Sequence, residues 1–131
     1  MAKVLQNIVA TTLTYNRPGL LFENYNAVIN GSLIPGCYII FDNGSDSNIT
    51  NEVDSRLKSL GWKLNDTKED IVNTGEEEAK IKIKTFNNDE FYSGVDLKHI
   101  ICEKNLFASG GFAAIFNMAM NLSYSFLWIM D

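Results

Sequence analysis

Four short strand-like runs alternate with amphipathic segments along this chain, and this alternation constrains the fold more than any other feature. The runs are Ile8–Leu13, Cys37–Phe41, Ile100–Cys102 and Phe126–Met130. Unbroken apolar and β-branched stretches of this length indicate strands that are covered on both faces, as in a parallel sheet. Strands that alternate with helices predict an α/β domain.

The intervening segments carry helical signals. Helices are expected at Pro18–Asn30, from about Asn48 to Gly61, and at Phe112–Leu122. In the first of these, proline suits the opening turn and Asn16 can act as the cap. The polar and glycine-containing residues 103–111 predict a loop before the third helix.

Right-handed crossovers fix the expected sheet. If the four runs are numbered along the chain, their predicted order is 3-2-1-4, in a mostly parallel, Rossmann-like sheet. The segment 62–98 is polar and acidic, and residues 79–86 alternate strictly between apolar and polar side chains. This segment is expected to be an insertion or an extended crossover that contains an edge or hairpin strand.

Composition limits the functional classes. The chain has 131 residues, 46% hydrophobic and 21% charged, with a net charge of -5, which indicates one soluble globular domain without a nucleic-acid surface. No signal peptide or transmembrane segment is expected, so the predicted location is the cytoplasm or the inner face of the membrane. Cys37 and Cys102 are expected to be buried free thiols, and His99, the only histidine, to be structural.

Polar residues follow every predicted strand. They are Thr14 to Arg17, Asp42 to Ser45, Glu103 to Asn105 with Ser109 to Gly111, and Asp131. Ligands of parallel sheets bind outside the carboxyl ends of the strands, at the point where the connections diverge. A carboxylate can accept hydrogen bonds from a base or a ribose, and glycines allow backbone N–H groups to approach a phosphate. These residues predict nucleotide binding, although neither GxGxxG nor a P-loop is present.

Four stretches together resemble a known family. "VATTLTYNRPGLL", "IIFDNGSDSNIT", "NLFASGGFAAIFNMAM" and "FLWIMD" are similar to the nucleotide-binding half of family 2 glycosyltransferases of the GT-A fold. The likeness is to the branch that contains rhamnosyl- and galactofuranosyl-transferases. It covers residues 8–60 and 99–131.

The resemblance implies a role for particular residues. The nucleotide pocket would be lined by Thr14, Tyr15, Asn16 and Arg17, with Asp42 on the base or ribose, Asn43 and Gly44 shaping the turn, and Asn105, Gly110 and Gly111 beside the sugar nucleotide. Asp131 would be the first aspartate of a metal-binding motif for Mg²⁺ or Mn²⁺, a site that is incomplete in this chain. Phe107 stands where the family usually has glycine.

The implied activity is transfer of a sugar from a UDP- or dTDP-linked donor to a glycan or cell-envelope acceptor. Residues 1–131 would form the donor-binding half, inactive alone, with the general base beyond them. The alternatives are a sugar nucleotidyltransferase-like enzyme and a non-catalytic nucleotide-binding remnant. A half-domain would leave Phe126 and Trp128 partly uncovered, so homo-oligomers are also expected.

Overall fold

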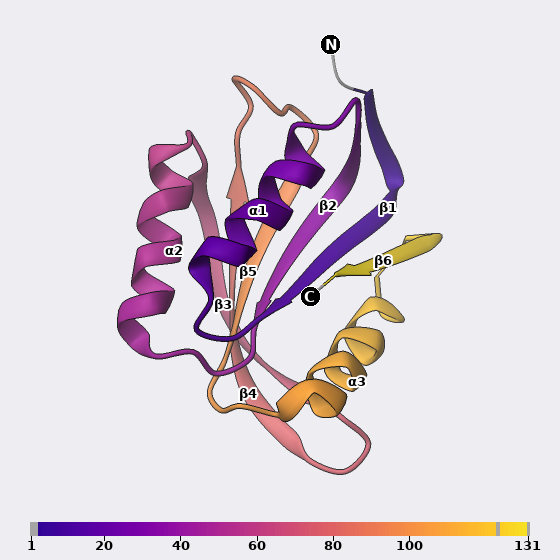
Figure 1. Ribbon diagram of the computed structural model, residues 1–131. Coiled ribbons are helices and arrows are strands. Elements are labelled where there is room, and N and C mark those ends of the chain that lie inside the picture. Colours follow the sequence, from indigo (N-terminus) through magenta and orange to yellow (C-terminus); the bar gives the residue numbers. More distant parts are fainter. Residues whose placement is uncertain (1–2, 123, 131) are drawn as a thin grey trace.

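The computed structural model of the protein describes residues 3–122 and 124–130 as an α/β fold (Figure 1). Strands and helices alternate at first, and a hairpin separates the second helix from the fifth strand. The elements are β1 (Lys3–Thr14), α1 (Pro18–Ile29), β2 (Leu33–Asp42), α2 (Ser47–Ser59), β3 (Lys63–Asn73), β4 (Glu78–Asn87), β5 (Asp96–Cys102), α3 (Phe107–Ala119) and β6 (Phe126–Met130).

The strands form one six-stranded mixed sheet with the order β3-β4-β5-β2-β1-β6. The pairs β5–β2, β2–β1 and β1–β6 are parallel, and they join the four strands that the sequence predicts. The pairs β3–β4 and β4–β5 are antiparallel. The sheet as a whole is therefore not a four-stranded 3-2-1-4 sheet, because residues 62–98 contribute two strands of their own to one edge.

The hairpin explains the alternating pattern in 79–86. Ala79, Ile81 and Ile83 are buried, whereas the two lysines between them are exposed. In β3, only Val72 is buried, so this strand forms a polar outer edge. Side chains alternate between the two faces of a strand, so a strand with one buried face has an apolar residue at every second position. Antiparallel sheets often have one buried face and one face in solvent.

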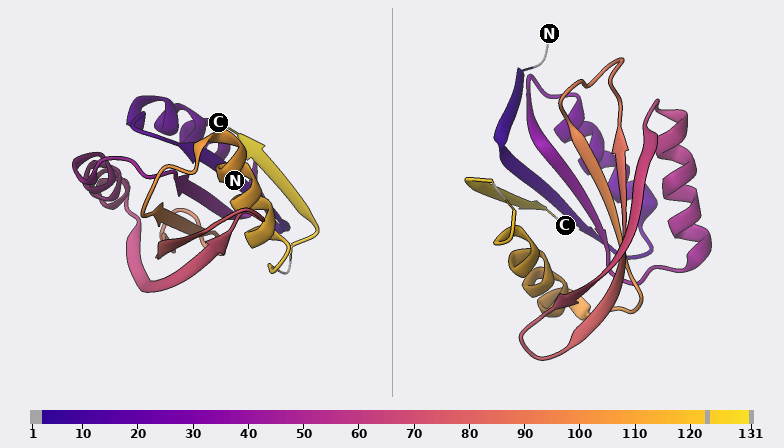
Figure 2. Two further views of the ribbon diagram at one scale, coloured as in Figure 1. Left: turned by 90° about the horizontal axis from the view of Figure 1, so that it is seen from below. Right: turned by 180° about the vertical axis from the view of Figure 1, so that it is seen from behind.

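Helices cover both faces of the sheet. Figure 2 shows α1 and α2 on one face and α3 on the other. Two separate apolar cores match these layers: one includes Leu21, Tyr25 and Leu57 of α1 and α2, and the other includes Ala114 and Ile115 of α3. Since β1 leads into α1 on one face and β6 follows α3 on the other, the connections diverge at β1.

Two local predictions are wrong. The third helix begins at Phe107, so Gly110 and Gly111 lie inside α3 and not in a loop. Asn16 does not cap α1, because Arg17 occupies the cap position and no side chain there accepts a capping hydrogen bond. The bounds of α1 agree with the predicted bounds to within one residue. The end of α2 lies two residues before the predicted end. Within the described residues, no helix has the length and apolar character needed to cross a membrane.

Candidate functional site

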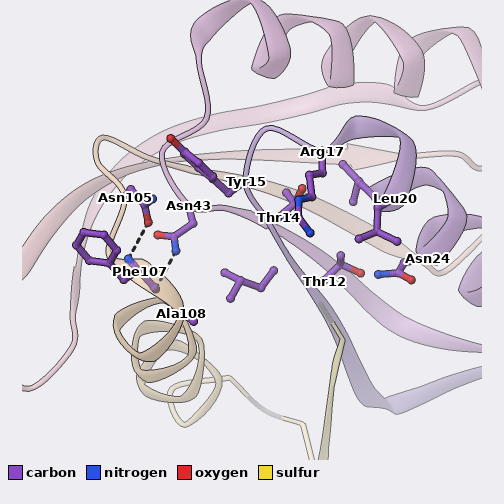
Figure 3. Close-up of a pocket in the computed structure, with 12 residues that line it drawn as sticks. Thr12, Thr14, Tyr15, Arg17, Leu20, Asn24, Asn43, Asn105, Phe107 and Ala108 are labelled. Carbon is purple, nitrogen blue, oxygen red and sulfur yellow. Dashed lines mark hydrogen bonds between the residues drawn. The ribbon is translucent and has the colours of Figure 1, made fainter.

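A cleft of about 410 Å³ lies at the carboxyl end of β1, between the first turns of α1 and α3 (Figure 3). Its lining comes from the end of β1, the turns after β1, β2 and β5, and both helices: Thr12, Leu13, Thr14, Tyr15, Arg17, Leu20, Leu21, Asn24, Asn43, Asn105, Phe107 and Ala108. This is the place where the connections of the sheet diverge, which is where open α/β sheets bind their ligands.

The cleft carries positive electrostatic character. Arg17 is the only charged side chain in its described lining. Neither α1 nor α3 has an acidic residue in its first turn or a side-chain cap at its N-cap residue. The N–H groups and dipoles at these two helix starts are thus not neutralised by carboxylates, and they favour an anion between them.

Asn43 fixes the wall of the cleft that α3 forms. The side chain is buried and its Oδ1 accepts a hydrogen bond of 2.9 Å from the Leu106 backbone N–H. Its Nδ2 donates to the carbonyl of Phe107 at 3.0 Å. Its own backbone N–H donates to the Thr14 carbonyl at 2.8 Å. Asn43 therefore ties the end of β1 to the start of α3, and its side-chain amide is bonded to protein groups.

Phe107 opens α3 with a φ of 60°, in the left-handed region that glycine prefers. The backbone N–H of Phe107 donates a hydrogen bond of 2.7 Å to Oδ1 of Asn105, and the Phe107 carbonyl accepts one from Asn43 Nδ2. The ring is 74% exposed, and Figure 3 shows it at the mouth of the cleft, directed away from Thr12 and Asn24. Glycine would adopt this conformation without the strain that a side chain with a Cβ brings.

The turn after β1 is held by the loop after β2. Asn16 has a φ of 52°, a left-handed conformation that asparagine tolerates better than most residues. Its backbone N–H donates to Ser45 Oγ at 2.8 Å, and its Oδ1 accepts from the Asp46 backbone N–H at 2.9 Å. Tyr15 and Arg17, on either side of it, line the cleft. Asn16 itself does not belong to the lining.

Asp42 lies beneath this loop and is 1% exposed. Its Oδ1 accepts a hydrogen bond of 2.8 Å from the Ser45 backbone N–H, and its Oδ2 accepts one of 3.2 Å from Thr50 Oγ1. Burial alone would raise the pKa of Asp42, but the neighbouring His99 and the bonds from Ser45 outweigh it and lower the pKa. The predicted contact of Asp42 with a base or ribose would require this network to open.

His99 is fully buried behind Asp42. Its Nδ1 lies 2.7 Å from Oδ1 of Asp54, and its Nε2 lies 3.9 Å from Oδ2 of Asp42. Burial would lower the pKa of His99, but the two carboxylates prevail and raise it. Asp54 also forms an ion pair with Lys84, and its pKa is lowered, because the same partners outweigh its burial.

The structure brings five of the ten predicted nucleotide-binding residues to the cleft. Thr14, Tyr15, Arg17, Asn43 and Asn105 line it. The other five lie outside the lining: Asn16, Asp42, Gly44, Gly110 and Gly111. Asp131 lies outside the described residues. Across those described, no group of three or more His, Cys, Asp or Glu side chains is arranged to hold a metal ion.

Two glycines permit close packing. A Cβ on Gly44 would come within 2.4 Å of the Asn105 nitrogen, and one on Gly111 would come within 2.9 Å of Asn43 Nδ2 and Leu13 Cδ1. Gly111 therefore lets α3 approach the end of β1. Gly111 lies inside α3 and not in the predicted loop, and its role beside a sugar nucleotide stays a prediction.

Sequence reasoning missed several lining residues, namely Thr12, Leu13, Leu20, Leu21, Asn24 and Ala108. The sequence indicates these residues only through their position. Each lies within a few residues or one helical turn of the junction between β1 and α1 or of the start of α3. Comparisons of the chain with protein-family models, curated proteins and solved structures found no match.

Proposed function

We propose that the cleft binds a nucleoside diphosphate sugar, with UDP or dTDP as the nucleotide, and that the chain is the donor-binding part of a glycosyltransferase. The observation that carries this proposal is the placement of Arg17 between two helix starts without acidic residues, at the point where the sheet connections diverge. The sequence resemblance, on residues 8–60 and 99–131, supplies the class of reaction.

The diphosphate is the part of the ligand for which the cleft is best suited. A guanidinium binds phosphate oxygens with paired hydrogen bonds, and helix N-termini add backbone donors. A cleft volume of about 410 Å³ is within the range of small-molecule sites. An acidic protein can in this way bind an anion through local groups.

The aromatic ring of Tyr15 is suited to the base. Its side chain is 45% exposed at the rim, above Asn43 in Figure 3. A base could stack on this ring, and such stacking tolerates different bases because every base has a π-face. The amide of Asn105, also in the lining, can donate or accept at a pyrimidine edge or a ribose.

The described lining offers neither a carboxylate nor a histidine. It therefore does not fit a divalent cation, and the predicted contact of Mg²⁺ or Mn²⁺ with Asp131 stays a prediction. It also contains no group suited to act as general base toward an acceptor hydroxyl. The proposal for these residues is donor binding, and transfer to a glycan acceptor belongs to the enzyme that the resemblance implies.

A thermal-shift series tests the proposal. With UDP, dTDP, ADP and NAD, each with and without Mn²⁺, we expect a pyrimidine diphosphate to give the largest shift, with little effect of Mn²⁺. If the dissociation constant is about 1 mM, ligand at about 10 mM stabilises the fold by roughly 1.4 kcal/mol. That corresponds to a rise of about 3–6 °C for a domain of this size. A preference for NAD, or no shift with any nucleotide, would overturn it.

A nucleotide-binding module without catalytic activity is the second candidate. It is favoured by one observation, the absence of any acidic or histidine side chain from the described lining. Both candidates predict nucleotide binding. Sugar transfer by the chain alone, measured with a labelled donor, would exclude the non-catalytic candidate and would also overturn the expectation that residues 1–131 are inactive alone.

A further inference from the structure

His99 is a buried titratable residue outside the cleft, and one of its ring nitrogens has no hydrogen-bond partner. Within the described residues, its Nε2 is one of two buried side-chain polar atoms left unpaired. That nitrogen faces Oδ2 of Asp42 at 3.9 Å, while Nδ1 is occupied by Asp54. A buried polar nitrogen without a bond is costly, and the cost is smallest when the ring is an imidazolium facing a carboxylate.

A chain of contacts leads from His99 to the cleft. Asp42 binds the backbone N–H of Ser45, and Ser45 Oγ accepts from the backbone N–H of Asn16. Asn16 returns a bond to the backbone of Asp46 and keeps its left-handed conformation. The chain of contacts begins with the ion pair between His99 and Asp42. Each hydrogen bond that follows is 2.8 to 2.9 Å long.

We propose that His99 is a positioning residue for the cleft, because its imidazolium holds the Asp42 carboxylate that orders the turn at Asn16. Tyr15 and Arg17 flank this turn, so loss of the imidazolium charge displaces the residues proposed to hold base and diphosphate. The inference rests on the proposed function, but the ordering of the turn can be measured without ligand.

The charged groups that face His99 come from three elements. Asp42 is at the end of β2, Asp54 is in α2, and Lys84 is opposite His99 in β4. With the imidazolium charged, two anions balance two cations. When it is neutral, a buried carboxylate loses its counter-charge, and Asp42 is the one without a lysine partner. Asp42 and its loop are therefore the part that relaxes.

The first experiment is an NMR titration of the ligand-free protein. Because the chain has a single histidine, its ring signals are assigned directly. We expect the backbone amides of Ser45, Asn16 and Arg17 to shift with the same midpoint as the His99 ring. If the ring titrates and these amides do not move, the proposed link is wrong.

Three variants complete the test with UDP binding as a function of pH. In the wild type, affinity should fall about fivefold or more as pH rises through the His99 pKa, the low end of typical coupling between linked sites. His99→Gln should remove this dependence. Ser45→Ala keeps the histidine with both aspartates, so its ring should still titrate while the dependence disappears. Ser59→Ala, whose hydroxyl bonds only the Arg56 carbonyl in α2, should behave as wild type.

The outcomes separate the two proposals. Equal pH profiles in the wild type and Ser45→Ala would overturn the role of His99 and leave nucleotide binding intact. If His99→Gln does not fold, Ser45→Ala still decides. If UDP binds to no variant at any pH, the proposed function falls, and the amide titration alone decides whether His99 orders the turn.

Discussion

Phe107 keeps a left-handed backbone that costs free energy. Because an L-residue with a Cβ pays about 1–2 kcal/mol there, Phe107→Gly should stabilise the fold by about 1 kcal/mol. The ring is largely exposed, so its loss removes little packing. Phe107→Ala keeps the strain and should leave stability almost unchanged. Urea unfolding of the three proteins measures this. Equal stability of the Gly and Ala variants would show that the backbone is unstrained.

Gly44 is the residue where two loops come closest. Its φ is 84°, and an added Cβ would come within 2.4 Å of backbone atoms of Lys104 and Asn105. Gly44→Ala should therefore cost about 2–4 kcal/mol, since backbone must move and the conformation is strained. Gly75→Ala is the control, with a φ of 92° and open space around the glycine. It should cost about 1 kcal/mol from strain alone. Thermal unfolding that ranks the two variants equally would contradict the close approach.

At the scale of elements, α2, β2, β4 and β5 meet at the buried charges around His99. A raised histidine pKa stabilises the fold below the ordinary value of 6.5, and this contribution is lost as pH rises through the folded pKa. The lowered pKa values of Asp42 and Asp54 act in the opposite direction. Their contribution is present above the ordinary value of 3.8 and is lost as pH falls through the folded values.

We therefore expect a stability maximum on the acidic side of neutrality. Urea unfolding across pH should show it, with a decline toward alkaline pH of about 1.4 kcal/mol for each unit by which the folded histidine pKa exceeds its ordinary value. His99→Gln should flatten the alkaline limb and keep the acidic one. A wild-type stability that is level from weakly acidic to weakly alkaline pH would show that folding does not raise the pKa of His99, and a stability that increases over this range would show that His99 is neutral in the fold.

The sequence predicts the elements whose signal is local. The unbroken apolar run at Cys37–Phe41 and the proline at the start of α1 are sufficient for β2 and α1. The start of α3 does not follow from local sequence, because the glycines at 110 and 111 indicate a loop. In the fold, Gly111 packs closely against Leu13 of β1 and Asn43 after β2, which are distant in the sequence. The pairing partners of β4 cannot be predicted either. Alternation shows that a strand has one buried face, but it does not show which strands are its neighbours.

The same reason limits prediction of the site. Tyr15 and Arg17 directly follow a strand, so their place at the cleft could be foreseen. The burial of Asp42 could not, because it depends on Thr50 in α2 and His99 in β5. A carboxylate at a strand end looks alike in sequence whether it faces a ligand or a neighbouring helix.

For the whole molecule, the two edges of the sheet differ. The β3 edge carries exposed charged residues at Lys63, Asp66, Lys68 and Glu69, which discourage pairing with another chain. The β6 edge has no charged residue, and Phe126 and Trp128 are 63% and 52% exposed.

We expect self-association through the β6 edge at high concentration. Trp128→Lys should reduce it, because a lysine on an edge strand opposes pairing, whereas Ile71→Lys on the exposed face of β3 should not. Light scattering over a wide concentration range measures the effect. A wild-type protein that stays monomeric throughout, or association unchanged by Trp128→Lys, would rule out this edge.

Calorimetric titration with UDP and uridine tests most directly whether the cleft recognises a diphosphate through Arg17. UDP should bind the wild type and uridine much more weakly. Arg17→Ala should weaken UDP by about tenfold, since a hydrogen bond to a charged group contributes roughly 1.5–3 kcal/mol, and leave uridine unchanged. Lys58→Ala removes the same charge from the exposed end of α2 and should match the wild type. UDP affinity that Arg17→Ala does not alter, or equal affinity for UDP and uridine, would contradict the account.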